Sequence, residues 1–147
     1  MRDNDPPCEN STSYVLDDQI GYLLRLASQR HAALFQASIP DDVTPTQFSA
    51  LMRLAEEGQC SQNHLGRLAG MDAATVKGVV DRLRAKELIR IARDPADKRR
   101  AVISLSQKGR ALVARLQNEG HRVTAQTLAP LNVAERHALL SALRKLI

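Results

Sequence analysis

The hydrophobic and polar positions between Ser61 and Leu105 predict two short helices followed by a β-hairpin. Ser61 is a favourable N-cap for the first helix, and Gly70 suits the left-handed residue that ends it. Asp72 can cap the second helix in the same way. The apolar positions of that second helix recur at helical spacing and are Val76, Val79, Val80 and Leu83. The second helix should therefore bury one face and leave the opposite face free.

A β-hairpin with a charged tip follows the two helices. Leu88–Ile91 favours a strand, and Ala101–Leu105 alternates apolar and polar positions as a return strand. The connecting segment RDPADKRR is rich in turn-forming and charged residues. This order of elements is typical of a winged helix-turn-helix, a module that reads duplex DNA. In such modules the first turns of the second helix enter the major groove, and here they carry Ala73, Ala74, Thr75 and Lys77.

Helical patterns flank this module on both sides, so the predicted fold is mainly α with a small β-hairpin wing. A polar arm, residues 1–13, is expected to be flexible and to precede a single domain, residues 14–147. Within that domain the winged helix-turn-helix is placed at about 44–105. A capping-box pattern at Thr44–Gln47 begins this module. The flanking helices are placed at about 14–37 and 107–147, and the second of these regions is interrupted near Pro130.

The positive charge of the chain is concentrated in this module. Residues 82–100 contain eight Lys or Arg and three Asp or Glu, so this segment alone carries +5. The net charge of the whole chain is also +5, and the remainder is therefore balanced. A focused basic patch at a wing indicates a polyanionic partner, whereas a merely solvated charged face would not need that location.

Two motifs in and after the hairpin resemble the MarR family of bacterial transcription regulators. Asp94, Asp97 and Arg99 match that family's D-x-x-D-x-R wing signature, and Leu105–Gly109 (LSQKG) matches its L-[ST]-x-x-G step from strand to helix. The resemblance extends from about Leu16 to the end of the chain. It implies that Arg99 enters a minor groove and that Asp94 or Asp97 helps to orient it through charge-assisted pairing.

The same resemblance implies a quaternary arrangement and a strand. In MarR-like proteins the terminal helices interlock with those of a second subunit, so an intertwined homodimer is expected here, with two recognition helices on a pseudo-palindromic operator. Cys60 is expected in a short strand that joins the wing sheet. The residues predicted to contact DNA are Ser61, Gln62, Asn63, Asp72, Ala73, Ala74, Thr75, Lys77, Arg82, Arg93, Asp97, Lys98, Arg99 and Arg100.

Members of the family often bind small aromatic acids in a cleft between the dimer helices and the winged module. Residues 61–75 also resemble MarR-type repressors of aromatic-acid degradation, including hydroxynicotinate-type pathways. The candidate effector-binding residues are Tyr22, Arg25, His31, Phe48 and Met52. Each has a structural alternative: a buried or interface histidine for His31, plain core for Phe48 and Met52, and a surface or dimer salt bridge for Arg25.

The sequence offers no enzymatic site. The four histidines are scattered, and no paired-cysteine pattern or phosphate-binding glycine loop accompanies them, so no catalytic residue, metal or cofactor is predicted. No apolar run is long enough to span a membrane, and a cytoplasmic location is expected. Cys8 and Cys60 leave redox regulation as an alternative. The resemblance argues against it, because peroxide-sensing members carry a cysteine early in the first helix, and Gly21 of the Gln19–Leu24 segment occupies that position here.

These observations favour a homodimeric, ligand-responsive DNA-binding regulator. Repression of a catabolic operon is the expected mode, with release by a small aromatic or heteroaromatic acid or its CoA thioester. The alternatives are a winged helix that binds nucleic acid or protein without sensing a ligand, and a redox-responsive regulator.

Overall fold

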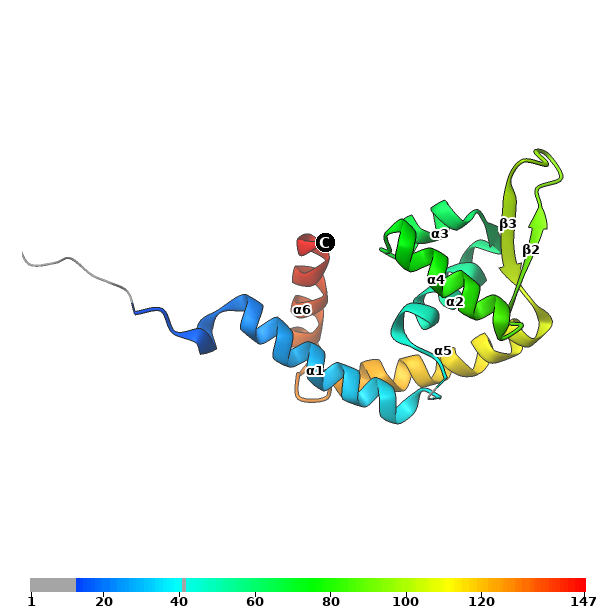
Figure 1. The fold of residues 1–147 in the computed structure, drawn as a ribbon. Helices are drawn as coiled ribbons and strands as arrows, with labels where there is room; N and C mark the ends of the chain where they lie inside the picture. Colours follow the sequence, from blue (N-terminus) through cyan, green and yellow to red (C-terminus); the bar gives the residue numbers. More distant parts are fainter. Residues whose placement is uncertain (1–12, 41) are drawn as a thin grey trace, which may run out of the picture.

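The computed structural model describes residues 13–40 and 42–147, so most of the predicted arm, including Cys8, lies outside the described residues. The described chain is mainly helical with one small sheet, which confirms the predicted fold class (Figure 1). The elements in chain order are η1 (Leu16–Asp18), α1 (Ile20–Ser38), α2 (Pro45–Glu57), β1 (Gln59–Cys60), α3 (Gln62–Leu68), α4 (Ala73–Ala85), β2 (Ile89–Arg93), β3 (Ala101–Leu105), α5 (Gln107–Leu128) and α6 (Val133–Leu146).

The helices begin where short polar side chains cap them. The side-chain oxygens of Thr44, Ser61, Asp72, Ser106 and Asn132 each accept a hydrogen bond from the backbone N–H three residues later. These bonds satisfy donors that a helix N-terminus otherwise leaves without an intrahelical partner. The caps predicted at Ser61 and Asp72 are therefore confirmed, as are the predicted starts of α2, α5 and α6.

The capping box predicted at Thr44–Gln47 is only half formed. Gln47 does not return a side-chain hydrogen bond to Thr44; it is buried, and its Oε1 accepts a hydrogen bond of 2.9 Å from Nζ of Lys86. Lys86 follows α4 directly, and its Nζ also donates to the backbone carbonyl of Asp42. The side chain of Gln47 thus bonds a distant partner in place of the local one that its spacing predicts.

The sheet has three antiparallel strands in the order β1-β3-β2. Cys60 lies opposite Ile103, which confirms the short strand expected at this cysteine. Strand β2 runs from Ile89 to Arg93, so it starts one residue later and ends two residues later than the predicted Leu88–Ile91. Its extra residues pair with β3 up to Arg93 opposite Ala101, and the wing tip begins only after that pair.

The hydrophobic core lies among α2, α3, α4, the sheet and α5, and the end of α1 joins it through Phe35. The side chains that are fully buried there are aliphatic and include Leu51, Leu54, Leu65, Leu83 and Leu116. A core of this kind is stabilised by the area that it removes from water, about 25 cal/mol per Å² of apolar surface. It holds α3, α4 and the wing as one rigid module.

The terminal helices leave part of their apolar surface uncovered in the single chain. α1 lies along α5, whereas α6 has no buried residue and stands apart from the winged module (Figure 1). Ile20 is 64% exposed and Leu146 67% exposed. Large aliphatic side chains are therefore exposed on both of these helices in the single chain.

Gly109 allows the start of α5 to pack directly against the chain that leads into β2. A Cβ at this position would collide with the backbone carbonyl oxygen of Leu88, and backbone atoms move less easily than the end of a side chain. We therefore expect Gly109→Ala to lower the free energy of unfolding by about 1–3 kcal/mol, the range typical of overpacking. Urea denaturation at fixed protein concentration measures this change. Gln107→Ala, an exposed position at the start of the same helix, should stay within about 0.5 kcal/mol of the unchanged protein, and equal stability of the two variants would contradict the predicted contact.

Candidate functional site

The helix-turn-helix consists of α3 and α4, joined at Gly70. Gly70 has φ +66°, a left-handed conformation that favours glycine, as predicted from the sequence. Gly66 brings the two helices close, because a Cβ there would lie only 3.2 Å from the carbonyl oxygen of Met71 and 3.2 Å from Cγ1 of Val76. The buried side chains of α4 are Val76, Val79, Val80 and Leu83, the four positions that the periodicity predicts.

The opposite face of α4 is open to solvent. Ala73, Ala74, Thr75 and Lys77 are all exposed, as a surface that reads DNA requires. Nζ of Lys77 lies 2.9 Å from Oδ2 of Asp81, one turn along the helix. Asp81 is not among the residues predicted from the sequence, although the i, i+4 spacing of opposite charges is a recognisable signal for such a pair.

Asp72 caps α4 at the point where the helix meets the turn. Its Oδ1 accepts a 2.7 Å hydrogen bond from the backbone N–H of Thr75. This bond is the largest cause that holds the pKa of the Asp72 carboxyl below its ordinary value, and a hydrogen bond with the side chain of Thr75 is a smaller one. The carboxylate is committed to the helix N-terminus, so its contribution to a DNA interface is the position of the first turn.

The wing tip is a tight turn built by the two acidic residues of the signature motif. Oδ1 of Asp94 accepts a hydrogen bond of 2.9 Å from the backbone N–H of Ala96, and Oδ1 of Asp97 accepts one of 3.0 Å from the backbone N–H of Arg99. The expected charge-assisted pairing with the Arg99 guanidinium is wrong, because neither carboxylate forms an ion pair with it. The acids shape the turn, and Arg93, Lys98, Arg99 and Arg100 are left exposed around it.

A shallow hollow separates α3 from the base of the wing. It has a volume of about 480 Å³ and is lined by Ser61, Gln62, Asn63, Arg67, Arg100 and Ala101. The structure therefore brings three of the predicted α3 residues together with one arginine of the wing. Arg67 is not among the predicted residues, although its place one turn after Asn63 on the exposed side of α3 could have indicated it.

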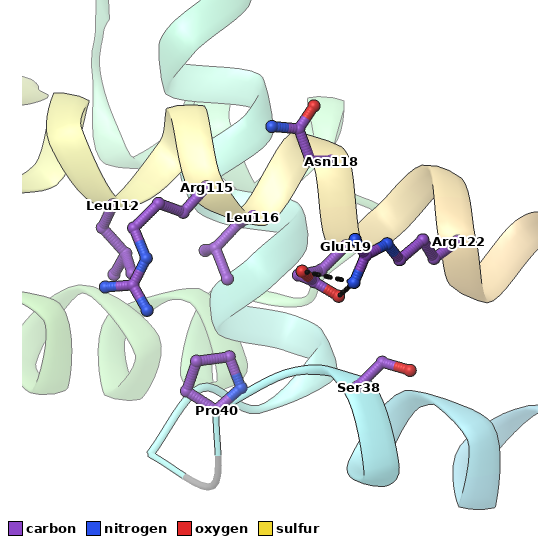
Figure 2. Close-up of a pocket in the computed structure, with 8 residues that line it drawn as sticks. All are labelled: Ser38, Pro40, Leu112, Arg115, Leu116, Asn118, Glu119 and Arg122. Atoms are coloured by element: carbon purple, nitrogen blue, oxygen red, sulfur yellow. Dashed lines mark hydrogen bonds and ion pairs between the residues drawn. The ribbon is translucent and has the colours of Figure 1, made fainter.

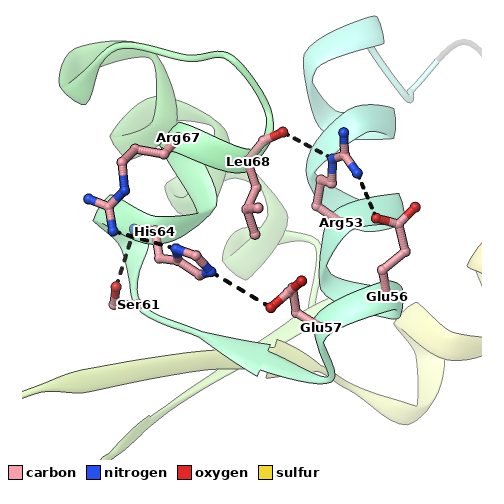
Figure 3. A network of polar contacts seen from close by, with 7 residues as sticks. All are labelled: Arg53, Glu56, Glu57, Ser61, His64, Arg67 and Leu68. Carbon is pink, nitrogen blue, oxygen red and sulfur yellow. Dashed lines mark hydrogen bonds and ion pairs between the residues drawn. The ribbon is translucent and has the colours of Figure 1, made fainter.

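Polar contacts between α2 and α3 fix the position of Arg67 (Figure 3). Nε2 of His64 lies 3.7 Å from Oε2 of Glu57, and a terminal nitrogen of Arg67 lies 3.4 Å from Nδ1 of the same histidine. At the other end of α3, Nε of Arg53 donates a 3.0 Å hydrogen bond to the carbonyl of Leu68. Both ends of α3 are thus tied to α2, which limits how far the helix can rotate.

A second hollow, of about 300 Å³, lies between α1, α2 and α5. The residues that line it are His31, Ala32, Phe35, Pro45, Phe48, Ser49, Gly120, Val123 and Thr124. The rings of Phe35 and Phe48 meet edge to face with centroids 5.6 Å apart. Gly120 leaves room for Phe48, because a Cβ there would lie 2.9 Å from Cζ of the ring. This hollow is therefore an aromatic-lined site with one titratable side chain at its wall.

The histidine in this hollow has a defined hydrogen-bonding role. Oγ1 of Thr127 donates to the carbonyl of Val123 at 2.7 Å and lies 2.8 Å from Nδ1 of His31. Because the only hydroxyl proton is used toward Val123, Nδ1 of His31 must carry the proton of the second bond and donate it. The neutral ring then leaves Nε2 as an acceptor, and the protonated ring makes it a donor.

The five candidate effector residues do not form one cluster in the single chain. His31 and Phe48 line the hollow between α1, α2 and α5, but Tyr22, Arg25 and Met52 do not. The guanidinium of Arg25 lies over the ring of Tyr22, 5.4 Å from its centroid, on α1. Met52 packs against the core. The α5 residues of this hollow are absent from the predicted set, although a glycine within a long helix, Gly120, is a usable signal for close packing.

A further hollow, of about 260 Å³, lies between α5 and the segment after α1, near Ser38 and Pro40 (Figure 2). Glu119 and Arg122, one turn apart on α5, form an ion pair at its wall, with 3.3 Å between a terminal nitrogen of Arg122 and Oε1 of Glu119. The side chain of Arg115 extends toward Pro40. None of the predicted DNA-binding or effector-binding residues lines it.

Comparisons with known proteins identify the family. Residues 41–100 match the model of the MarR family. The chain is 38% identical to the HTH-type transcriptional repressor NicR of Pseudomonas putida over 142 residues, which cover 96% of this chain and 89% of that protein. The chain belongs to the MarR family of transcriptional regulators.

Two solved structures are also similar to this chain over most of its length. A probable transcriptional regulator from Pseudomonas aeruginosa is 50% identical, with a TM-score of 0.87, and the match covers 90% of this chain and all of that one. BpsR of Bordetella bronchiseptica, whose DNA binding is regulated by 6-hydroxynicotinic acid, is 41% identical with a TM-score of 0.87, over 91% of this chain and 96% of its own.

Membership of the MarR family confirms two expectations from the sequence. The chain is a winged helix-turn-helix transcriptional regulator, and it is not an enzyme. Within the part of the chain that the structure describes, no group of three or more potential ligands is placed to hold a metal ion. No helix in that part is long and apolar enough to cross a membrane.

The cap at Asp72 generates a prediction about pH. Because hydrogen bonding lowers the folded-state pKa of Asp72, its contribution to stability is complete above the unfolded-state pKa, about 4. That contribution is lost as pH falls through the lowered folded-state pKa. Asp72→Ala should therefore destabilise the protein at pH 6, and the difference from the unchanged protein should shrink toward pH 3. Urea unfolding at several pH values measures it, and a difference that is constant with pH would contradict the proposed cap.

Proposed function

We propose that the chain is a homodimeric, ligand-responsive regulator that binds operator DNA and represses transcription. The observation that carries this proposal is the arrangement of the exposed face of α4 and the cationic wing on one rigid module. The wing projects away from α5, on the side of the module where α3 lies (Figure 1). Chromosomal DNA as the partner would place the protein in the cytoplasm.

The proposed contacts with DNA divide into base reading and positioning. The first turns of α4, with Ala74, Thr75 and Lys77, read base edges in the major groove. The wing carries Arg99 to a minor groove, where its charge meets the phosphates and the narrow-groove potential. The hollow lined by Asn63 and Arg100 supports a phosphate contact, because residues with an amide and a guanidinium group both line it. The regulated DNA binding of BpsR, a relative of the same fold, also supports this role.

Dimerisation follows from the uncovered aliphatic surface of the terminal helices. Ile20, Leu23 and Leu24 on α1, together with Leu140 and Leu146 on α6, are exposed in the single chain. We propose that a second copy covers them, as in the family, so that two α4 helices are held at a fixed separation. Such a dimer matches the two-fold symmetry of a pseudo-palindromic operator.

The proposed effector is a small aromatic or heteroaromatic acid, or its CoA thioester, and its proposed site is the hollow between α1, α2 and α5. Phe35 and Phe48 supply an apolar wall for a ring, and Nε2 of His31 can meet a hydroxyl or carboxylate. The response of BpsR to 6-hydroxynicotinic acid supports this ligand class. A ligand between α1 and the α2–α5 pair would favour one spacing of the two winged modules and so change operator affinity.

Two alternatives remain testable. Redox control through Cys60 is disfavoured, because burial and then the charge of Glu57 raise the pKa of its thiol and reduce the reactive thiolate. Cys8 lies outside the described residues. A winged helix without ligand sensing would bind promoter DNA and show no response to any aromatic acid.

Arg99→Ala should weaken operator binding by more than about tenfold, because loss of a minor-groove arginine costs roughly 1–3 kcal/mol. A gel-shift titration against the duplex that the unchanged protein enriches most strongly from a random-sequence library measures the change. Arg122→Ala, which removes the same charge from α5 at a position paired with Glu119, is the matched control and should bind as the unchanged protein does. Equal affinities for the two variants would remove the wing from the proposed interface.

6-Hydroxynicotinic acid should raise the melting temperature of the protein in a concentration-dependent way, since a ligand at 100 times its Kd adds about 2.7 kcal/mol of stability. His31→Ala should weaken this binding about tenfold through loss of the hydrogen bond from Nε2. His121→Ala, an exposed histidine of α5 that does not line the hollow, is the control. Binding that is unaffected by His31→Ala would exclude the proposed site, and no shift with the unchanged protein would exclude this ligand.

A further inference from the structure

Gly78 lies in the second turn of α4 and is a glycine that the packing of the protein does not require. Its φ is outside the left-handed region that favours glycine. A Cβ at this position would have one neighbour within 4 Å, Nη1 of Arg82 at 3.5 Å, which is an ordinary contact with the movable end of a side chain. Alanine would therefore fit without any rearrangement of the protein.

Most other glycines of the described chain have an internal reason. Gly58 and Gly70 have positive φ values of +77° and +66°. Gly66, Gly109 and Gly120 sit against neighbours that a Cβ would meet at closer than ordinary contact distance. Gly21 shares the open surroundings of Gly78, but it lies in α1 and not in the helix-turn-helix.

Glycine in the interior of a helix is unfavourable. It leaves the unfolded chain more freedom than alanine does and adds no side-chain contact in the folded state. In α4 no packing contact in the folded chain offsets this cost, since the one atom near the position of a Cβ at Gly78 is the end of the Arg82 side chain. A residue that lowers stability without serving the packing is a candidate for a role in recognition.

Gly78 lies on the outward side of α4 and is half-buried, with the end of the Arg82 side chain beside it. At 100° per residue it lies on the side of α4 opposite the buried side chains of Val76, Val79, Val80 and Leu83. Ala74, four residues earlier, lies on the same line and is exposed. The ion pair of Lys77 and Asp81 borders this line on one side, and Arg82 borders it on the other. The centre of the exposed face is thus a narrow apolar strip between charged side chains.

We propose that Gly78 is a specificity-determining residue for operator DNA. Without a Cβ, the backbone of α4 comes close enough to a base edge for the side chains on either side of the strip to reach their base and phosphate partners. A methyl group at Gly78 holds the helix away from one base pair in each half-site. This inference rests on the proposed reading of DNA by α4.

The test compares stability, operator affinity and nonspecific affinity in one variant. The unchanged dimer selects duplexes from a random-sequence library, and the most enriched duplex is the operator probe. Gly78→Ala should melt about 2–4 °C higher, because alanine has the greater helix propensity. It should bind the operator probe at least about tenfold more weakly, because close base contacts are lost. Its affinity for a scrambled duplex of the same composition should stay within about twofold, since phosphate contacts dominate there.

Asn118→Ala is the matched control, because it also raises helix propensity but at an exposed position of α5. It should melt higher and bind both duplexes as the unchanged protein does. Operator affinity of Gly78→Ala within about twofold of the unchanged protein, or an equal loss on both duplexes, would overturn the inference alone. If the unchanged protein enriches no sequence, the proposed function fails as well.

Discussion

The packing of one face of α4 against the aliphatic core is the interaction on which the rest of the structure depends. Val76, Val79, Val80 and Leu83 are almost entirely removed from water. Burial of such side chains stabilises the folded state by about 1.5–3 kcal/mol each. Because these four positions fix the rotation of the helix, they also decide which side chains face outward. The exposed face of α4 is therefore set by its buried face, and a change in the rotation of the helix changes both faces together.

The local features of this chain could be predicted from sequence, because short-range interactions decide them. The cap at Asp72 and the left-handed turn at Gly70 each depend on residues within four positions. The long-range polar contacts could not be predicted in this way. Gln47 bonds Lys86, 39 residues away, although its spacing from Thr44 indicated a local bond. The partner of a buried amide depends on which donor the fold brings near it, and periodicity does not contain that information.

The candidate site shows the same division. Small and polar residues at the start of α4 indicated an exposed reading face, since they follow a helical period. The sequence predicts that the carboxylates of the wing pair with the side chain of Arg99, but in the structure they accept hydrogen bonds from the backbone of the turn. Charge attraction alone favoured the first arrangement, whereas unpaired backbone N–H groups in a tight turn require acceptors and favour the second. The hollow at His31 needs three helices from separate parts of the chain, so sequence spacing could suggest its members but not their grouping.

The hydrogen bond between Gln47 and Lys86 has a mechanical consequence. Gln47 lies in the first turn of α2, next to Phe48 and near Pro45, which border the aromatic hollow. Lys86 is the residue that directly follows α4. The wall of the hollow and the far end of the reading helix are therefore joined through an amide that is 3% exposed. Water has little access to Gln47 and so competes poorly with the lysine for this amide, which makes the bond a fixed link between the first turn of α2 and the end of α4.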